Sequence, residues 1–364
     1  MDVYEHLAYH LSRLGMGMPD NDDLREILKA NLTPMEAEVA LLFPTRVTPM
    51  QPVSVDVIAS SGAISREKLV PVLEALYEKG FLFSGRTSGG EIGYALHQVG
   101  FGFPQTFFWK GEENPHNRKM AASIAKYFNR NVTREAYGST KTKTSRYIPP
   151  TETTNQDIEA VLPYHMMDWV VSNATQIAVA NCSCRMAMKL LGKSCEHPME
   201  VCLKFDEMAQ YLIDSGQGRE ITKQEARNLI KTSEQAGLVH FVDNCIEGIK
   251  HNCNCCGCAC WNVGSIKRRK IPRDTLMATY FLRVTEQKDC TGCEHCLQVC
   301  PVDALTMKEN FPLTDNDWCI GCGVCVAKCP ADAAKLTIRA DIEQPPIQNF
   351  KMLHEKILKE KGLA

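Results

Sequence analysis

The chain has 364 residues and a formal net charge of −2, and its composition is 44% hydrophobic and 23% charged. This length allows two or three domains. The near-neutral net charge excludes the strongly basic balance that is typical of proteins binding nucleic acid or an anionic membrane surface. The unusual count is 18 cysteines, all of which follow residue 181.

A secreted disulfide framework does not fit this pattern. The start of the chain, Met1 to His6, lacks a basic segment and a long apolar run, so no secretory signal is expected. No window approaches the roughly 18 uninterrupted apolar residues that a membrane-spanning helix needs. We therefore expect the cysteines to stay reduced or metal-bound, in the cytoplasm of an anaerobe.

Residues 1–105 predict helices followed by a hairpin. The expected elements are a helix capped by Thr33, helices over 53–59 and 66–79, and strands over 81–83 and 92–96. This order resembles a winged helix-turn-helix. DNA binding requires several uncompensated cations, whereas the helix over 66–79 balances three basic side chains with three acidic ones. The sequence therefore favours protein docking or a structural role, and nucleic acid is not the expected partner.

Residues 106–165 form a connector with an excess of basic residues, including a polar stretch over 139–145 that predicts an exposed loop or arm. Two interpretations stay open for it, a solvated basic face and a docking surface for an acidic partner or anionic ligand.

Residues 166–262 contain the first ten cysteines. We predict a mainly helical cysteine-rich domain, in which a hairpin of helices over 203–213 and 223–236 brings two groups of cysteines together. Neighbours such as Cys255 and Cys256 point in different directions, which favours two metal centres or a cluster of unusual shape. Cys245 is the weakest candidate. The candidate metal ligands are Cys182, Cys184, Cys195, Cys202, Cys253, Cys255, Cys256, Cys258 and Cys260.

Zinc and iron–sulfur clusters both fit the ligands of this middle domain. Iron–sulfur is favoured because a second cysteine block follows closely, and electron relays need neighbouring centres. We expect one or two further iron–sulfur clusters here.

A basic linker over 263–279 leads into residues 280–340, where strands are expected over 280–284 and 334–339. Between these strands, the run C-x2-C-x2-C-x3-C-P begins at Cys290 and occurs again 29 residues later, beginning at Cys319. Residues 341–364 form a tail, in which the residues after Pro345-Pro346 predict a helix with one apolar face.

The spacing of these runs explains how they would hold two cubanes. Three thiolates at x2 intervals reach one cluster from one side, and the x3 step with its proline turns the chain away, so the fourth cysteine of each run ligates the other cluster. A zinc site would have no use for the third x2 step. The two predicted ligand sets are Cys290, Cys293, Cys296 and Cys329, and Cys319, Cys322, Cys325 and Cys300.

These runs resemble the bacterial-type two-cluster [4Fe–4S] ferredoxin family over residues 281–338, and all eight ligand positions match. The resemblance implies one-electron transfer. The Cys182-x-Cys184-Arg185 and Cys253-x-Cys255-Cys256-x-Cys258 motifs extend it, over residues 179–338, to a group of multi-cluster iron–sulfur proteins of anaerobes. In that group a cysteine often stands where this chain has Ala259.

We therefore expect an α+β multidomain protein with a winged-helix-like, a cysteine-rich and a ferredoxin-like domain. Its expected function is electron transfer between a redox donor and a partner oxidoreductase, within an oxidoreductase complex. Two alternatives stay open: a redox-sensing DNA-binding regulator, and a reductase that acts at an unusual cluster in the middle domain.

Overall fold

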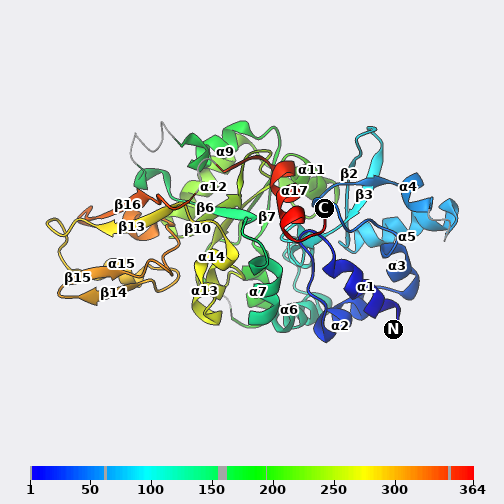
Figure 1. Cartoon of the computed structure of the whole chain (residues 1–364), viewed down its shortest axis with the longest axis horizontal. Coiled ribbons are helices and arrows are strands. Elements are labelled where there is room, and N and C mark those ends of the chain that lie inside the picture. Colours follow the sequence, from blue (N-terminus) through cyan, green and yellow to red (C-terminus); the bar gives the residue numbers. More distant parts are fainter. Residues whose placement is uncertain (1, 61–63, 155–161, 194, 343–345) are drawn as a thin grey trace.

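The computed structural model describes residues 2–60, 64–154, 162–193, 195–342 and 346–364. Helices and strands are mixed, and three parts follow one another along the long axis (Figure 1). The N-terminal helices lie at one end, the eight-cysteine unit of residues 281–338 lies at the other, and a sheet lies between them. The chain therefore has a central body with a cap at each end.

The N-terminal part begins with helices and ends with a small antiparallel sheet of order β1-β3-β2. Thr33 caps the third helix through a reciprocal capping box with Glu36, as its sequence pattern predicts. The elements are α1 (Val3–Ser12), α2 (Asp22–Asn31), α3 (Pro34–Ala40), β1 (Val53–Ser54), α4 (Val55–Ala59), α5 (Arg66–Glu78), β2 (Leu82–Arg86) and β3 (Ile92–Leu96).

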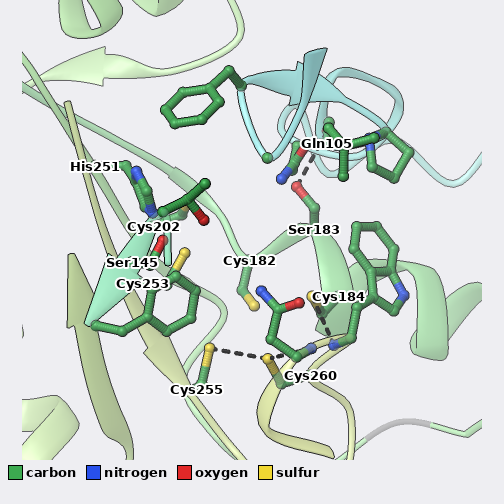
Figure 2. Close-up of a pocket in the computed structure, with 18 of the residues that line it drawn as sticks. Gln105, Ser145, Cys182, Ser183, Cys184, Cys202, His251, Cys253, Cys255 and Cys260 are labelled. Carbon is green, nitrogen blue, oxygen red and sulfur yellow. Dashed lines mark hydrogen bonds between the residues drawn. The ribbon is translucent and has the colours of Figure 1, made fainter. Parts of the chain in front are cut away.

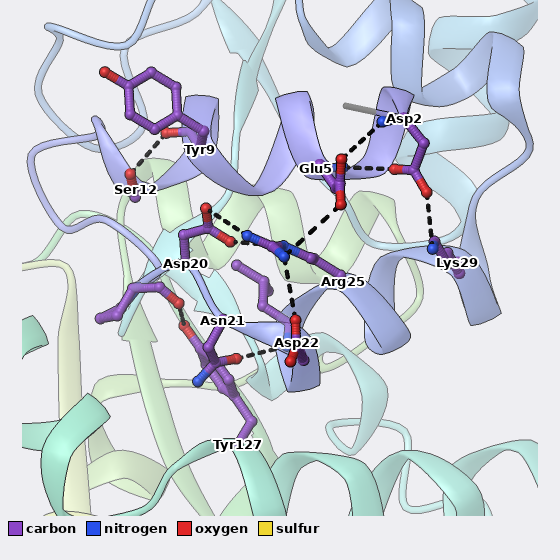
Figure 3. A network of polar contacts seen from close by, with 12 residues as sticks. Asp2, Glu5, Tyr9, Ser12, Asp20, Asn21, Asp22, Arg25, Lys29 and Tyr127 are labelled. Carbon is purple, nitrogen blue, oxygen red and sulfur yellow. Dashed lines mark hydrogen bonds and ion pairs between the residues drawn. The ribbon is translucent and has the colours of Figure 1, made fainter.

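Polar contacts join the first helices to the next part of the chain (Figure 3). Arg25 of α2 contacts Asp20 and Asp22, both at 3.1 Å. Because Arg25 and Asp22 are solvent-accessible, these ion pairs add little to stability. The buried hydroxyl of Tyr127 donates to the carbonyl of Pro19 at 3.0 Å, and this bond ties the loop before α2 to helix α6 (Pro115–Tyr127).

The segment predicted as a connector is instead part of the packed body. Helix α6 (Pro115–Tyr127) buries Met120 and Ile124 in the N-terminal core. Helix α7 (Arg130–Gly138) follows, and β6 (Ser145–Ile148) is an edge strand of the central sheet. Residues 139–144 form the predicted loop, in which Ser139 and Lys141 are exposed, but Thr140, Thr144 and Ser145 are buried. The segment is therefore only partly exposed, because its end leads into strand β6 at Ser145.

The central sheet has six antiparallel strands in the order β6-β10-β12-β8-β7-β9. The other elements between the N-terminal sheet and this sheet are short: β4 (Gln98–Val99), β5 (Gly102–Phe103), η1 (Gln105–Phe107), η2 (Thr151–Thr153), η3 (Pro163–His165) and α9 (Met167–Asn173). The sheet and its helices comprise β7 (Ile177–Asn181), α10 (Ser183–Leu190), β8 (Glu200–Phe205), α11 (Glu207–Asp214), β9 (Arg219–Glu220), α12 (Lys223–Gln235), β10 (Val239–Asp243), β11 (Cys245–Glu247) and β12 (His251–Cys255).

The middle part is therefore not mainly helical, and this prediction is corrected. Residues 200–205 form strand β8, whereas a helix was expected to begin at 203. The strands were hard to recognise because their inward positions carry cysteine, asparagine and lysine in place of the usual apolar residues. The cysteines meet at a sheet face and at helix α10, and not at the ends of a helical hairpin.

The predicted basic linker contains two short helices, α13 (Val263–Arg269) and α14 (Arg273–Leu276). The eight-cysteine unit then pairs β13 (Phe281–Thr285) with β16 (Ala334–Ile338), and β14 (Leu305–Lys308) with β15 (Phe311–Thr314), around α15 (His295–Gln298) and α16 (Val324–Ala327). The tail returns to the body: β17 (Ile347–Asn349) pairs with β11, and helix α17 (Phe350–Glu360) buries Leu353 and Ile357. Among the described residues, no helix has the length and apolarity needed to cross a membrane.

Candidate metal centres

Two small cavities in the eight-cysteine unit are each lined by four cysteines. Their compositions equal the two sets that the spacing predicts, with the fourth cysteine of each run reaching the other run's cavity. The first cavity is lined by Cys290, Cys293, Cys296 and Cys329, and the second by Cys300, Cys319, Cys322 and Cys325.

The backbone repeats along with the sequence. Positions 29 residues apart adopt the same left-handed conformation: Gly292 and Gly321 have φ of 67° and 58°, and Glu294 and Gly323 have φ of 60° and 74°. Gly321 also needs to lack a side chain, since a Cβ would lie 2.0 Å from the carbonyl oxygen of Phe281. These turns direct consecutive cysteines of one run toward a common point.

The two cavities differ in depth. In the first set Cys293 is exposed, whereas Cys319, Cys322 and Cys325 of the second set are buried. Burial raises the pKa of the Cys325 thiol to about 12, so this site would carry protons until a metal displaces them. The first site thus lies nearer to solvent and the second nearer to the body.

Arg283 of β13 lines both cavities and is 4% exposed. Its Nη2 lies 3.9 Å from the sulfur of Cys296. Burial raises the pKa of Cys296 and of Cys325, and in both cases the guanidinium acts in the opposite direction. A buried cation between two sets of thiols is suited to stabilising negative charge at both.

The middle part contains a larger cavity, of about 70 Å³, with six cysteines around it (Figure 2). They come from the start of helix α10, from strands β8 and β12, and from the loop after β12. We call this set the thiol ring, because the six thiols surround one cavity. Its members are Cys202, Cys253, Cys255, Cys260, Cys184 and Cys182.

The thiol ring is suited to negative charge. The sulfurs of Cys255 and Cys260 lie 3.2 Å apart. Hydrogen bonds from Cys202 and Cys255 hold the pKa of Cys253 well below its usual value. Backbone N–H groups also donate to ring sulfurs: Asn262 to Cys260 at 3.3 Å, and Trp261 to Cys184 at 3.4 Å. Such donors stabilise metal-bound thiolates.

Two buried cations accompany the ring. Lys204 lines the cavity, and its Nζ lies 5.3 Å from the centre of the Trp109 ring. Arg185 donates to the carbonyl of Asn254 at 3.1 Å, and its guanidinium also interacts with the thiol of Cys256. Burial lowers the pKa of Arg185, but the nearby thiols of Cys182 and Cys256 raise it by more. The pKa of Arg185 therefore lies above its ordinary value.

No carboxylate pairs with Lys204 or Arg185 in the part of the chain that the structure describes. Buried charges need compensation, and the nearby sulfurs are the groups able to provide it as thiolates. The surroundings therefore fit thiolates that bind a metal.

The three remaining candidates form a separate group. Sulfurs of Cys195, Cys256 and Cys258 lie within 4.8 Å of one another. Cys245 joins neither group: it is buried beside Arg146, and burial raises the pKa of its thiol. The structure thus divides the middle cysteines into six, three and one.

Tyr147 of β6 connects the thiol ring with the eight-cysteine unit. It is 1% exposed and belongs to an apolar cluster that also contains Cys255, Cys260 and Cys322. Burial raises its pKa well above the usual value, and these same three thiols add to the shift. The side chain therefore packs near cysteines of both the ring and the second, deeper cavity.

Sequence reasoning missed Tyr147, Lys204 and Arg283. A lysine two residues after Cys202 was a usable signal, because both side chains face the same side of a strand. Nothing in the local pattern marks Tyr147, whose role depends on the packing of separate segments.

Comparison with known protein families matches residues 283–330 to the model of a 4Fe-4S dicluster domain. All eight cysteines of the two runs fall within it. This part of the chain is therefore a ferredoxin-like iron–sulfur domain. No curated protein matches the chain.

Proposed function

We propose that this chain is an iron–sulfur electron-transfer protein, or a subunit of an oxidoreductase complex, in the cytoplasm of an anaerobe. It would relay single electrons between a redox donor and a partner oxidoreductase. The observation that carries the proposal is the packing of Tyr147 in one apolar cluster with cysteines of the deeper ferredoxin cavity and of the thiol ring. Two cysteine sites that share one buried apolar cluster are suited to exchanging electrons.

Each ferredoxin-like set would hold one [4Fe–4S] cluster, a carrier of single electrons. Cys290, Cys293, Cys296 and Cys329 form the outer site, and exposed Cys293 marks where a redox partner would approach. The buried set around Cys322 forms the inner site. The thiol ring would follow as a further iron–sulfur site, with Arg185 and Lys204 compensating its charge.

A second candidate is reduction of a substrate at the thiol ring. It is favoured by the count of six thiols, since a cubane needs four. Lys204 and His251 also line the cavity and could contact an anionic group. A DNA-binding regulator has less support, because two cations of α5 and its C-cap are engaged: Arg66 pairs with Asp56, and Lys79 with Glu36 at 2.7 Å.

The element order α3-β1-α4-α5-β2-β3, with its three-stranded sheet, supports a winged-helix assignment for residues 1–105. We propose that this part docks a protein partner. The full arrangement would comprise this domain, the body, the ferredoxin-like domain over 280–340 and the tail over 341–364.

The testing experiment is iron and acid-labile sulfide analysis of anaerobically purified protein, with electron paramagnetic resonance after reduction. About eight irons per chain are expected for the ferredoxin-like pair, and about twelve to sixteen when the ring is also loaded. Cys253→Ala should reduce the count while leaving the ferredoxin signals intact, and Cys245→Ala is the matched control. Protein with bound zinc and without reducible iron would overturn the proposal.

A further inference from the structure

The group of Cys195, Cys256 and Cys258 has a geometry unlike that of the cubane sites. Its three sulfurs lie within 4.8 Å of one another. Around one tetrahedral ion with metal–sulfur bonds of about 2.3 Å, neighbouring sulfurs lie about 3.8 Å apart. In a cubane each thiolate binds a different iron, which spreads the sulfurs. Among the described residues, no three ferredoxin cysteines form such a compact group.

The group is also separate from the thiol ring, although Cys256 follows Cys255 directly. Strand β12 ends at Cys255, and successive side chains of an extended chain point to opposite sides. Cys255 therefore faces the ring cavity, and Cys256 packs beside Cys195. The guanidinium of Arg185 interacts with both Cys255 and Cys256. The two groups share the guanidinium of Arg185 but no cysteine.

The loop that carries Cys256 and Cys258 lies against the ferredoxin-like domain. A Cβ at Gly257 would lie 2.2 Å from the carbonyl oxygen of Pro301, so the two backbones are in contact. Arg268 holds the same loop, with donation to the carbonyls of Gly257 at 2.9 Å and Cys260 at 2.8 Å. The loop therefore packs directly against Pro301, which follows the inner ligand Cys300 in the sequence.

Next to this loop is an open groove of about 540 Å³, lined by Cys256, Cys258 and His197. Three thiolates leave one position of a tetrahedral ion unfilled, and His197, whose ring nitrogens lie outside the compact group of sulfurs, lines the same groove. Cysteine with histidine is a common ligand set of structural zinc.

We propose that Cys195, Cys256 and Cys258 bind a single zinc ion, with the fourth position directed to the groove and His197. The ion fastens the 256–258 loop against Pro301 and so fixes the distance between the body and the inner ferredoxin site. Binding displaces the thiol protons and transfers no electron.

The test is metal analysis of the full chain, purified anaerobically with its iron. About one zinc per chain is expected. Cys195→Ser and Cys258→Ser should lose this zinc and keep the iron, and Cys245→Ser should keep both. Loss of iron in these variants, or a chain without zinc, would overturn the proposal.

Zinc-edge X-ray absorption of the unmutated protein does not depend on whether the variants fold. We expect a shell of three sulfurs at about 2.3 Å and one lighter ligand. His197→Ala should retain zinc and alter the lighter shell. An edge dominated by oxygen would indicate surface zinc only and would contradict the proposal, while leaving the electron-transfer function untouched.

Discussion

The guanidinium of Arg283 lies 3.9 Å from the sulfur of Cys296, and the same side chain lines the cavity of the second cysteine set. One buried cation therefore acts on both ferredoxin sites. Reduction adds negative charge to each site, so this cation stabilises the reduced form more than the oxidised form.

Replacing Arg283 with methionine should lower the reduction potential at both sites. Two unit charges about 8 Å apart interact by about 2 kcal/mol at an effective dielectric constant of about 20. For a one-electron couple this corresponds to roughly 90 mV. Redox titration followed by electron paramagnetic resonance measures the shift. Arg283→Lys, which keeps the charge, should shift far less, and equal potentials in all three proteins would contradict the prediction.

The crossed ligand sets predict which site each fourth cysteine serves. Cys329 lines the cavity of the first run, and Cys300 lines that of the second. Cys329→Ala should therefore impair the exposed site, and Cys300→Ala the buried one. Selective labelling of the thiols released in each variant, identified by mass spectrometry, distinguishes the two outcomes. If each substitution released the cysteines of its own run, the crossing would be wrong.

Two substitutions of Tyr147 should differ in their effects on stability and on electron transfer. Its hydroxyl has no hydrogen-bond partner among the described residues, so Tyr147→Phe should change the free energy of unfolding by less than about 1 kcal/mol. Tyr147→Ala removes a buried ring and should cost about 3–5 kcal/mol.

Rapid-freeze spectroscopy can follow how fast the thiol ring is reduced after the ferredoxin sites. We expect the thiol ring of the Tyr147→Phe variant to be reduced as fast as that of the unmodified protein. In the destabilised Tyr147→Ala variant, we expect slower electron transfer to the thiol ring. Unchanged transfer in a folded alanine variant would remove Tyr147 from the route.

The ferredoxin-like sets could be predicted from sequence because their ligands are local and repeated. Three of four cysteines in each set come from one short run, and the fourth follows from the repeat. The thiol ring could not be resolved this way. Cys202 and Cys253 meet because β8 and β12 pair across the sheet, and such pairing leaves no mark in cysteine spacing. The strands themselves were missed where Asn252, Asn254 and Lys204 occupy buried positions.

Part of the arrangement of the middle cysteines could be predicted from adjacent residues. The opposed directions of Cys255 and Cys256 follow from backbone geometry alone, and they separate the ring from the group at Cys195. The helices whose ends carry capping residues, such as α3 at Thr33, were predicted within a residue or two, because capping is a local property.

His97 makes stability depend on pH. It is fully buried, its Nδ1 lies 2.9 Å from the carbonyl of Phe101, and its Nε2 lies 2.9 Å from the hydroxyl of Tyr211. Burial lowers its pKa from 6.5 to about 4. Between these values the unfolded chain binds more protons than the folded one, so stability is complete above pH 6.5 and falls as the pH drops toward 4.

The loss attributable to His97 is about 1.4 kcal/mol at pH 5.5 and about 3 kcal/mol near pH 4. Anaerobic thermal unfolding at pH 7.5 and 5.5 measures it. His97→Gln should show a smaller drop in midpoint between the two conditions, because the variant has no group to protonate there. His6→Gln, at an exposed position, should respond as the unmodified protein does. If His97→Gln lost as much stability as the unmodified chain, another buried group would have to account for the acid sensitivity.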